Sequence, residues 1–125
     1  MKKVLVVEDN KDNLRLITYA LRRADFEVIG AQTGIQGVEL ALKEDPYFII
    51  MDINLPDING LEATKRIRAE GKGGYIPIIA ITSYAMAGDM EKILGCGCNG
   101  YFEKPIDPIT IVDQMLAIVS DITTY

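Results

Sequence analysis

Acidic, hydroxyl and amino side chains stand at or just beyond the ends of apolar runs in this sequence. Glu8 and Asp9 follow the first run of strand length, and Asp52 follows a later one. Thr82 and Lys104 stand near the ends of the last two runs. Because the carboxyl ends of parallel strands meet at one end of a sheet, we expect these side chains to converge there.

The three carboxylates, Glu8, Asp9 and Asp52, indicate a cation site. Two carboxylates about 5 Å apart repel by roughly 3 kcal/mol at an effective dielectric constant of about 20. A hard divalent cation removes this repulsion, and a set of oxygen ligands suits Mg²⁺. With Mg²⁺ bound, an aspartate could attack a phosphoryl group. Lys104 would then pair with phosphoryl oxygens, and Thr82 would donate a hydrogen bond to another.

Composition and charge exclude several other classes of function. The chain has 125 residues, 49% hydrophobic and 25% charged, as expected for one globular domain. Its net charge of −5 disfavours binding to nucleic acid or to an anionic membrane. It contains no histidine, which excludes Ser-His and Cys-His nucleophile pairs and histidine metal ligands.

The two cysteines and the apolar runs give no sign of redox chemistry or of a membrane. Cys96 and Cys98 are separated by Gly97 alone, which fits neither a CxxC redox motif nor a paired zinc knuckle. We interpret them as small, largely buried side chains. No apolar run is long enough for a membrane span or a secretory signal, so we expect a cytoplasmic protein.

Strand and helix patterns alternate along the chain. The apolar runs of strand length are residues 4–7, 26–29, 48–51, 76–81 and 100–102. The second and fifth runs are more mixed in polarity, which favours edge positions in a sheet. Helical spacing lies between the runs, so the pattern predicts a single α/β domain of (βα)5 type, with a parallel sheet and helices on both faces. We expect this domain to span residues 1–125 and no effector domain to follow.

Several residues are expected to begin or end the helices. The predicted N-caps are Thr33 (in a capping box with Gln36), Asn59 and Asp107, the last followed by Pro108 at the first helical position. Ile35 and Ile109 are expected to begin the apolar faces of their helices. A weaker helix is predicted over 86–94, with Gly97 as its stop.

The order of these motifs resembles the receiver domain of bacterial response regulators, the CheY-like superfamily. The motifs are Glu8-Asp9, Asp52 before the segment INLPDING, Thr82, and Lys104-Pro105. The segments ITSYAM and GCNGYFEKP look most like those of DivK-type single-domain regulators and of hybrid-kinase receivers. The resemblance covers nearly the whole chain, and it implies a flavodoxin-like sheet with strand order 2-1-3-4-5.

The resemblance also implies a role for each site residue. Asp52 would be the phosphoacceptor, and Mg²⁺ would be bound by Asp9, Asp52 and the backbone carbonyl of Asn54, with Glu8 acting through a metal-bound water. Thr82 and Tyr101 would form a switch pair, and the peptide bond before Pro105 is usually cis in the family. Asn54 and Tyr84 occupy positions that tune the lifetime of the phosphoryl group.

The partners implied are a histidine kinase or a histidine phosphotransfer protein as phosphoryl donor, and a downstream protein target. The target would dock on the face built from the fourth helix, fifth strand and fifth helix. We expect a monomer, with phosphorylation-dependent dimerisation left open. The chain would catalyse its own phosphorylation and dephosphorylation and act as a switch instead of a turnover enzyme.

Three alternatives have weaker support from the residues. A Mg²⁺-dependent phosphatase with an aspartyl-phosphate intermediate would have a second aspartate two positions after the nucleophile, where this chain has Asn54. A flavodoxin-like cofactor carrier would need a loop rich in hydroxyl groups after the first strand, where this chain is acidic. A receiver-like scaffold that is never phosphorylated would not need the complete set of signature residues.

Overall fold

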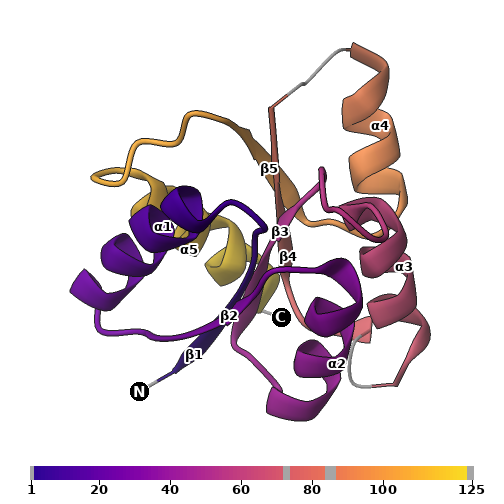
Figure 1. Ribbon diagram of the computed structural model, residues 1–125, viewed down its shortest axis with the longest axis horizontal. Coiled ribbons are helices and arrows are strands. Elements are labelled where there is room, and N and C mark those ends of the chain that lie inside the picture. The colour runs from indigo at the N-terminus through magenta and orange to yellow at the C-terminus, as the bar shows by residue number, and fades with distance from the viewer. Residues whose placement is uncertain (1, 72–73, 84–86, 124–125) are drawn as a thin grey trace.

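The protein is described by a computed structural model that covers residues 2–71, 74–83 and 87–123. Five strands and five helices alternate along it (Figure 1). The strands are β1 (Lys3–Val7), β2 (Glu27–Ala31), β3 (Phe48–Asp52), β4 (Ile78–Thr82) and β5 (Gly100–Glu103). The helices are α1 (Lys11–Arg23), α2 (Gly34–Glu44), α3 (Gly60–Ala69), α4 (Ala87–Gly95) and α5 (Ile111–Thr123).

The strands form one parallel sheet in the order β2-β1-β3-β4-β5, which confirms the predicted order. β1 pairs with β3 so that Val7 lies opposite Met51, and β3 pairs with β4 so that Asp52 lies opposite Ile81. β2 and β5 are the edge strands, as their mixed polarity predicted. The carboxyl ends of β1, β3 and β4 therefore lie side by side.

Two apolar cores flank the sheet. One face of the sheet packs on α1 and α5, and the other packs on α2, α3 and α4 (Figure 1). All residues of β3 and β4 are buried, which accounts for their continuous apolar sequences. Among the described residues, no helix is both long and apolar enough to cross a bilayer.

Side-chain caps begin three of the helices. Asn10 accepts from the Asn13 amide at 3.0 Å, Thr33 from Gln36 at 3.1 Å and Asn59 from Glu62 at 2.9 Å. The caps at Thr33 and Asn59 confirm those predictions. The capping box differs in its second half, because the Gln36 side chain accepts from the Gln32 amide instead of the Thr33 amide.

The prediction for the start of α5 was wrong by one turn. Asp107 Oδ1 accepts from the Ile109 amide at 2.9 Å and closes an Asx turn, so residues 108–110 form a turn and α5 begins at Ile111. Ile109 is 83% exposed as a result. Ile35 is also exposed, because the fully buried face of α2 is formed by Gly34, Gly37 and Ala41, with Val38 packed half-buried beside them.

α4 ends in a Schellman motif. The Gly97 amide donates to the Leu94 carbonyl and the Cys98 amide to the Ile93 carbonyl, with φ of 116° at Gly97. This confirms Gly97 as the stop. Met86, the first residue of the predicted helix, lies outside the described residues. Cys98 is buried and Cys96 is half-buried, both as free thiols.

Arg68, near the end of α3, holds this turn from the side. Its guanidinium donates to the Gly97 carbonyl at 2.8 and 3.0 Å, to Asn99 Oδ1 at 2.9 Å and to the Ile76 carbonyl at 2.6 Å. Asn99 in turn exchanges hydrogen bonds with the backbone of Ile78 at 2.7 and 2.8 Å. The network fixes the amino ends of β4 and β5, at the end of the sheet away from the acidic residues.

Candidate functional site

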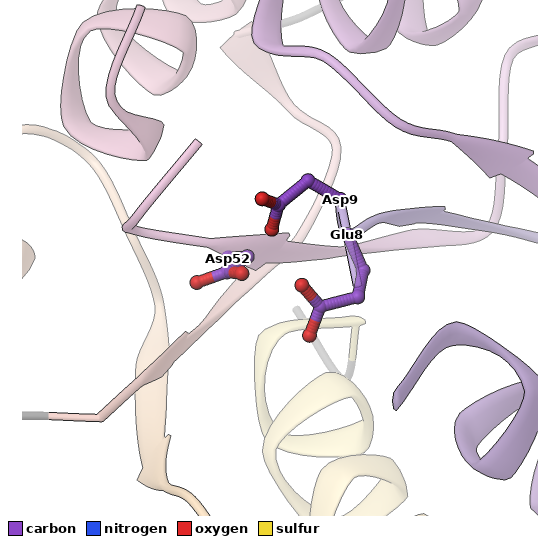
Figure 2. Close-up of side chains that lie close together, drawn as sticks. All are labelled: Glu8, Asp9 and Asp52. Carbon is purple, nitrogen blue, oxygen red and sulfur yellow. The ribbon is translucent and has the colours of Figure 1, made fainter. Parts of the chain in front are cut away.

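The three carboxylates predicted to converge do so at the carboxyl end of the sheet. Glu8 and Asp9 directly follow β1, and Asp52 is the last residue of the neighbouring β3. One carboxylate oxygen from each lies within 4.8 Å of the others, and Figure 2 shows the three side chains close together at the ends of the strands. The parallel register alone therefore brings residues 44 positions apart into one cluster.

Lys104 reaches the same cluster from beyond β5. Its Nζ lies 2.8 Å from Glu8 Oε1 and 3.0 Å from Asp52 Oδ2. The side chains of Glu8 and Asp52 are 1% and 2% exposed, whereas Asp9 is exposed. One ammonium group faces three carboxylates, so the cluster keeps an excess of negative charge when all four groups are ionised.

Burial shifts the protonation of Glu8. It raises the pKa of the Glu8 carboxyl to about 7, and the neighbouring Asp52 adds to the rise while Lys104 opposes it. Burial alone would lower the pKa of Lys104, but its contacts with Glu8 and Asp52 outweigh burial and raise it. Lys104 therefore stays charged at neutral pH, and Glu8 exchanges its proton near neutrality.

The chemistry of the cluster fits a hard divalent cation such as Mg²⁺. Its ligand atoms are carboxylate oxygens, which are the ligands that Mg²⁺ prefers. Lys104 Nζ contacts Glu8 Oε1 and Asp52 Oδ2, but a single ammonium group does not balance three carboxylates. A divalent cation would remove the remaining negative charge.

The loop after β3 is held close to Asp52. The Asn54 amide donates to Asp52 Oδ1 at 3.0 Å, and the Gly60 amide donates to the Ile53 carbonyl at 2.9 Å. A Cβ on Gly60 would lie 2.2 Å from the Asp52 carbonyl oxygen, so this approach requires glycine. Both oxygens of Asp52 are thus engaged, Oδ1 by Asn54 and Oδ2 by Lys104.

Asp57 in the same loop has a structural role that the sequence reasoning missed. Its carboxylate accepts from the amides of Gly34 and Ile35, the first residues of α2, at 2.7 and 2.9 Å. These backbone hydrogen bonds, led by that of Ile35, lower the pKa of Asp57 to about 2. The sequence gives little indication of this role, because an aspartate in a loop after a strand is usually solvated.

The remaining predicted residues lie around the cluster. Thr82 is the last residue of β4, it is 3% exposed, and its carbonyl accepts from the Lys104 amide at 2.9 Å. Tyr101 is half-buried on β5, where it packs against the core under α2, α3 and α4. The Lys104-Pro105 peptide bond is cis, as the resemblance implied. Tyr84 lies outside the described residues.

A pocket of about 260 Å³ adjoins the cluster between α1 and the segment after β5. Glu8 and Lys104 line it together with residues of α1, including Asn13 and Leu16. The buried charged groups can therefore be approached from the surface.

Comparison with known proteins identifies the family. The family described as response regulator receiver domain matches residues 4–116. This chain belongs to that family. It is a receiver domain of a two-component response regulator, and this confirms the resemblance inferred from its motifs.

Curated relatives support the same assignment. The polar-differentiation response regulator DivK of Brucella ovis is 36% identical to this receiver domain over 120 residues, which cover 96% of this chain and 98% of DivK. DivK of Brucella anthropi matches to the same extent. The predicted likeness to DivK-type regulators is borne out.

Solved structures share the fold, and one of them contains a metal ion. The receiver domain of a sensor histidine kinase from Pseudomonas aeruginosa is 35% identical, with a TM-score of 0.87 and coverage of 95% of this chain and 98% of that chain. Its structure has a magnesium ion coordinated in the active site cleft. Chemotaxis protein CheY4 of Vibrio cholerae is 27% identical, with a TM-score of 0.89 and coverage of 94% of this chain and 98% of that chain.

Proposed function

We propose that this receiver domain acts in the cytoplasm as the response regulator of a two-component phosphorelay, with Asp52 as the phosphoacceptor. The observation that carries the proposal is the position of Asp52. Its carboxylate is buried at the end of β3, shares one cluster with Glu8 and Asp9, and lies 3.0 Å from Lys104 Nζ. The donor would be a phosphohistidine on a histidine kinase or a histidine phosphotransfer protein, since this chain has no histidine.

The proposed reaction exchanges one bond to phosphorus for another. A carboxylate oxygen of Asp52 attacks phosphorus, a P–O bond forms, and the P–N bond to the donor imidazole breaks. Lys104 follows the transferred charge, because its ammonium group can move from Asp52 Oδ2 to a phosphoryl oxygen. Thr82, buried at the neighbouring strand end, donates its hydroxyl hydrogen to another phosphoryl oxygen.

The residues that would hold Mg²⁺ are Asp9, Asp52 and the carbonyl of Asn54, with Glu8 acting through a water. Bound there, the ion would neutralise negative charge on the phosphoryl oxygens as they approach the carboxylates. Asp9 is exposed and Glu8 is buried, so the cluster offers ligand oxygens at two depths. The magnesium ion in the Pseudomonas aeruginosa receiver domain supports this assignment.

The output of the switch would be a change of surface. Thr82 would move toward the phosphoryl group, and Tyr101 would follow it further into the core on which it already packs. The face of α4, β5 and α5 would then present a new contact to a downstream protein target. The chain would catalyse both its phosphorylation and its slow dephosphorylation, as a switch and not as a turnover enzyme.

The test is intact-mass measurement after incubation with acetyl phosphate and Mg²⁺. We expect a gain of one phosphoryl group that is lost in Asp52→Asn and in the presence of a chelator. Asp113→Asn, an exposed aspartate in the first turn of α5, is the matched control and should react like the wild type. A wild-type chain that gains no mass from acetyl phosphate or from a phosphorylated histidine phosphotransfer protein would indicate an unphosphorylated scaffold.

A further inference from the structure

We propose that Asp57 is a positioning residue for the acidic site, because it clamps the loop after β3 to the amino terminus of α2 and so sets the affinity for Mg²⁺. The inference rests on the proposed function, since it concerns the same cation. The Asp57 carboxylate is bonded to the amides of Gly34 and Ile35 and not to Asp52, Glu8 or Asp9. Its effect would pass through the backbone of residues 54–57.

The clamp is a two-point contact between segments distant in sequence. One oxygen of Asp57 accepts from the Gly34 amide at 2.7 Å, and the other accepts from the Ile35 amide at 2.9 Å. Amides in the first turn of a helix have no partner within the helix. A carboxylate that binds two of them is therefore held in both distance and orientation.

Close packing reinforces the clamp. A Cβ on Gly34 would lie 2.5 Å from Ile58 Cγ1 and 2.9 Å from the Ile58 carbonyl oxygen. The backbone of α2 thus meets the loop directly at the residue after Asp57. The loop cannot slide along the helix without breaking these contacts.

Charge favours the same arrangement. α2 is described along its whole length, and its first turn contains no acidic side chain of its own. The amino terminus of a helix carries partial positive charge, so Asp57 supplies the negative charge that the helix lacks. The low pKa of Asp57, about 2, reflects this stabilisation of the ionised carboxylate by backbone amides.

The clamp bears on the metal site because the connection is short and stiff. Leu55 and Pro56 alone separate Asp57 from Asn54, and proline restricts the backbone at its own position and at the one before it. On the other side, the Asn54 amide is bonded to Asp52 Oδ1. The Asn54 backbone is therefore held from both sides, by Asp52 and by Asp57.

The experiment compares Asp57→Ala with Thr33→Ala. Thr33 caps the same helix by accepting from the Gln36 amide at 3.1 Å, but it belongs to α2 and not to the loop. Mg²⁺ is titrated into each ¹⁵N-labelled protein, with amide chemical shifts as the readout. We expect Asp57→Ala to raise the Mg²⁺ dissociation constant about tenfold, the scale seen when a group that orients metal ligands is removed, and Thr33→Ala to leave it within about twofold.

Two further measurements separate positioning from a loss of stability. In metal-free protein, amide hydrogen exchange at 53–60 should accelerate in Asp57→Ala and stay unchanged in Thr33→Ala. Asp57→Asn, which keeps one acceptor oxygen, should give an intermediate dissociation constant, and it serves in place of the alanine variant if that variant does not fold.

The outcomes distinguish this inference from the proposed function. Equal Mg²⁺ affinities of wild type, Asp57→Ala and Asp57→Asn would overturn the positioning role and leave the proposed function standing. Equal losses in Asp57→Ala and Thr33→Ala would assign the effect to α2 stability and would also overturn it. A wild-type protein that does not bind Mg²⁺ would overturn both.

Discussion

Glu8 combines near-complete burial with a pKa raised to about 7. The folded protein therefore binds a proton on Glu8 in the pH range where the unfolded chain, with an ordinary value of 4.5, does not. In the metal-free protein, Glu8 therefore contributes to the free energy of unfolding. This contribution is fully present below pH 4.5, the pKa of the unfolded chain, and is lost as pH rises through about 7. A cation should reverse this trend, because it favours the ionised carboxylate.

We predict that Mg²⁺ binding by the wild-type protein weakens as pH falls below about 7. Mg²⁺ and the Glu8 proton compete, so the apparent affinity should fall by up to about tenfold per pH unit. Isothermal titration calorimetry across this range measures the slope. In Glu8→Gln the slope should be much smaller, because the side chain that competes with Mg²⁺ for a proton has been removed, while Asp9, Asp52 and Lys104 are retained. A slope equal to that of the wild type would show that Glu8 is not the group that titrates.

At the scale of elements, the start of α3 lies directly against the backbone of Asp52. We predict that Gly60→Ala lowers the free energy of unfolding by about 3 kcal/mol or more, because the new Cβ would meet the backbone carbonyl of Asp52 at 2.2 Å. Urea denaturation followed by circular dichroism measures the loss. The same variant should react poorly with acetyl phosphate.

Gly95→Ala is the matched control for that substitution. Gly95 is also a helix residue, at the end of α4, and a Cβ there would have no described atom within 4 Å. Its stability should be unchanged or raised by up to about 1 kcal/mol. Similar losses in both variants would mean that helix glycines matter here for a reason other than contact with Asp52.

The sequence was sufficient for elements whose signals are local. N-caps at Thr33 and Asn59, the stop at Gly97 and the edge positions of β2 and β5 were all correctly predicted from neighbouring residues. The start of α5 was not, because an Asx turn and an N-cap use the same aspartate and differ only in which amide it accepts from. Asp57 could not be assigned a partner, since α2 becomes its neighbour only when the sheet has formed.

The site could be predicted from the sequence to a similar extent as the fold. Glu8, Asp9, Asp52 and Lys104 are recognisable because each lies near the end of a strand, and parallel strands end together. The sequence does not reveal which of the three carboxylates are buried, and the raised pKa of Glu8 follows mainly from burial. Arg68 likewise has the appearance of an ordinary helix-surface residue until the amino ends of β4 and β5 are placed beside it.

At the scale of the whole molecule, a chain of net charge −5 concentrates three of its carboxylates at one point. We predict that Mg²⁺ raises the melting temperature. At a concentration tenfold above the dissociation constant, the stabilisation is about 1.4 kcal/mol, which corresponds to roughly 5 °C for a domain of this size. Differential scanning calorimetry measures the shift.

The control for this prediction is NaCl at the same ionic strength, because any salt screens the net charge of the chain. Asp9→Asn should reduce the shift caused by Mg²⁺ and leave the effect of NaCl unchanged. Equal shifts with MgCl₂ and NaCl would mean that general screening, and no specific site, stabilises the protein.

The hydrogen bonds of Arg68 hold the turn between α4 and β5 against α3. They pin the turn over residues 97–99, which joins the end of α4 to the start of β5, whereas the acidic cluster lies at the opposite end of the sheet. When the far ends of α4 and β5 are displaced, we expect both elements to rotate about this turn, because the turn itself is held in place. A small displacement near Thr82 would therefore grow with distance from Gly97, and the largest excursion is expected where α4 begins.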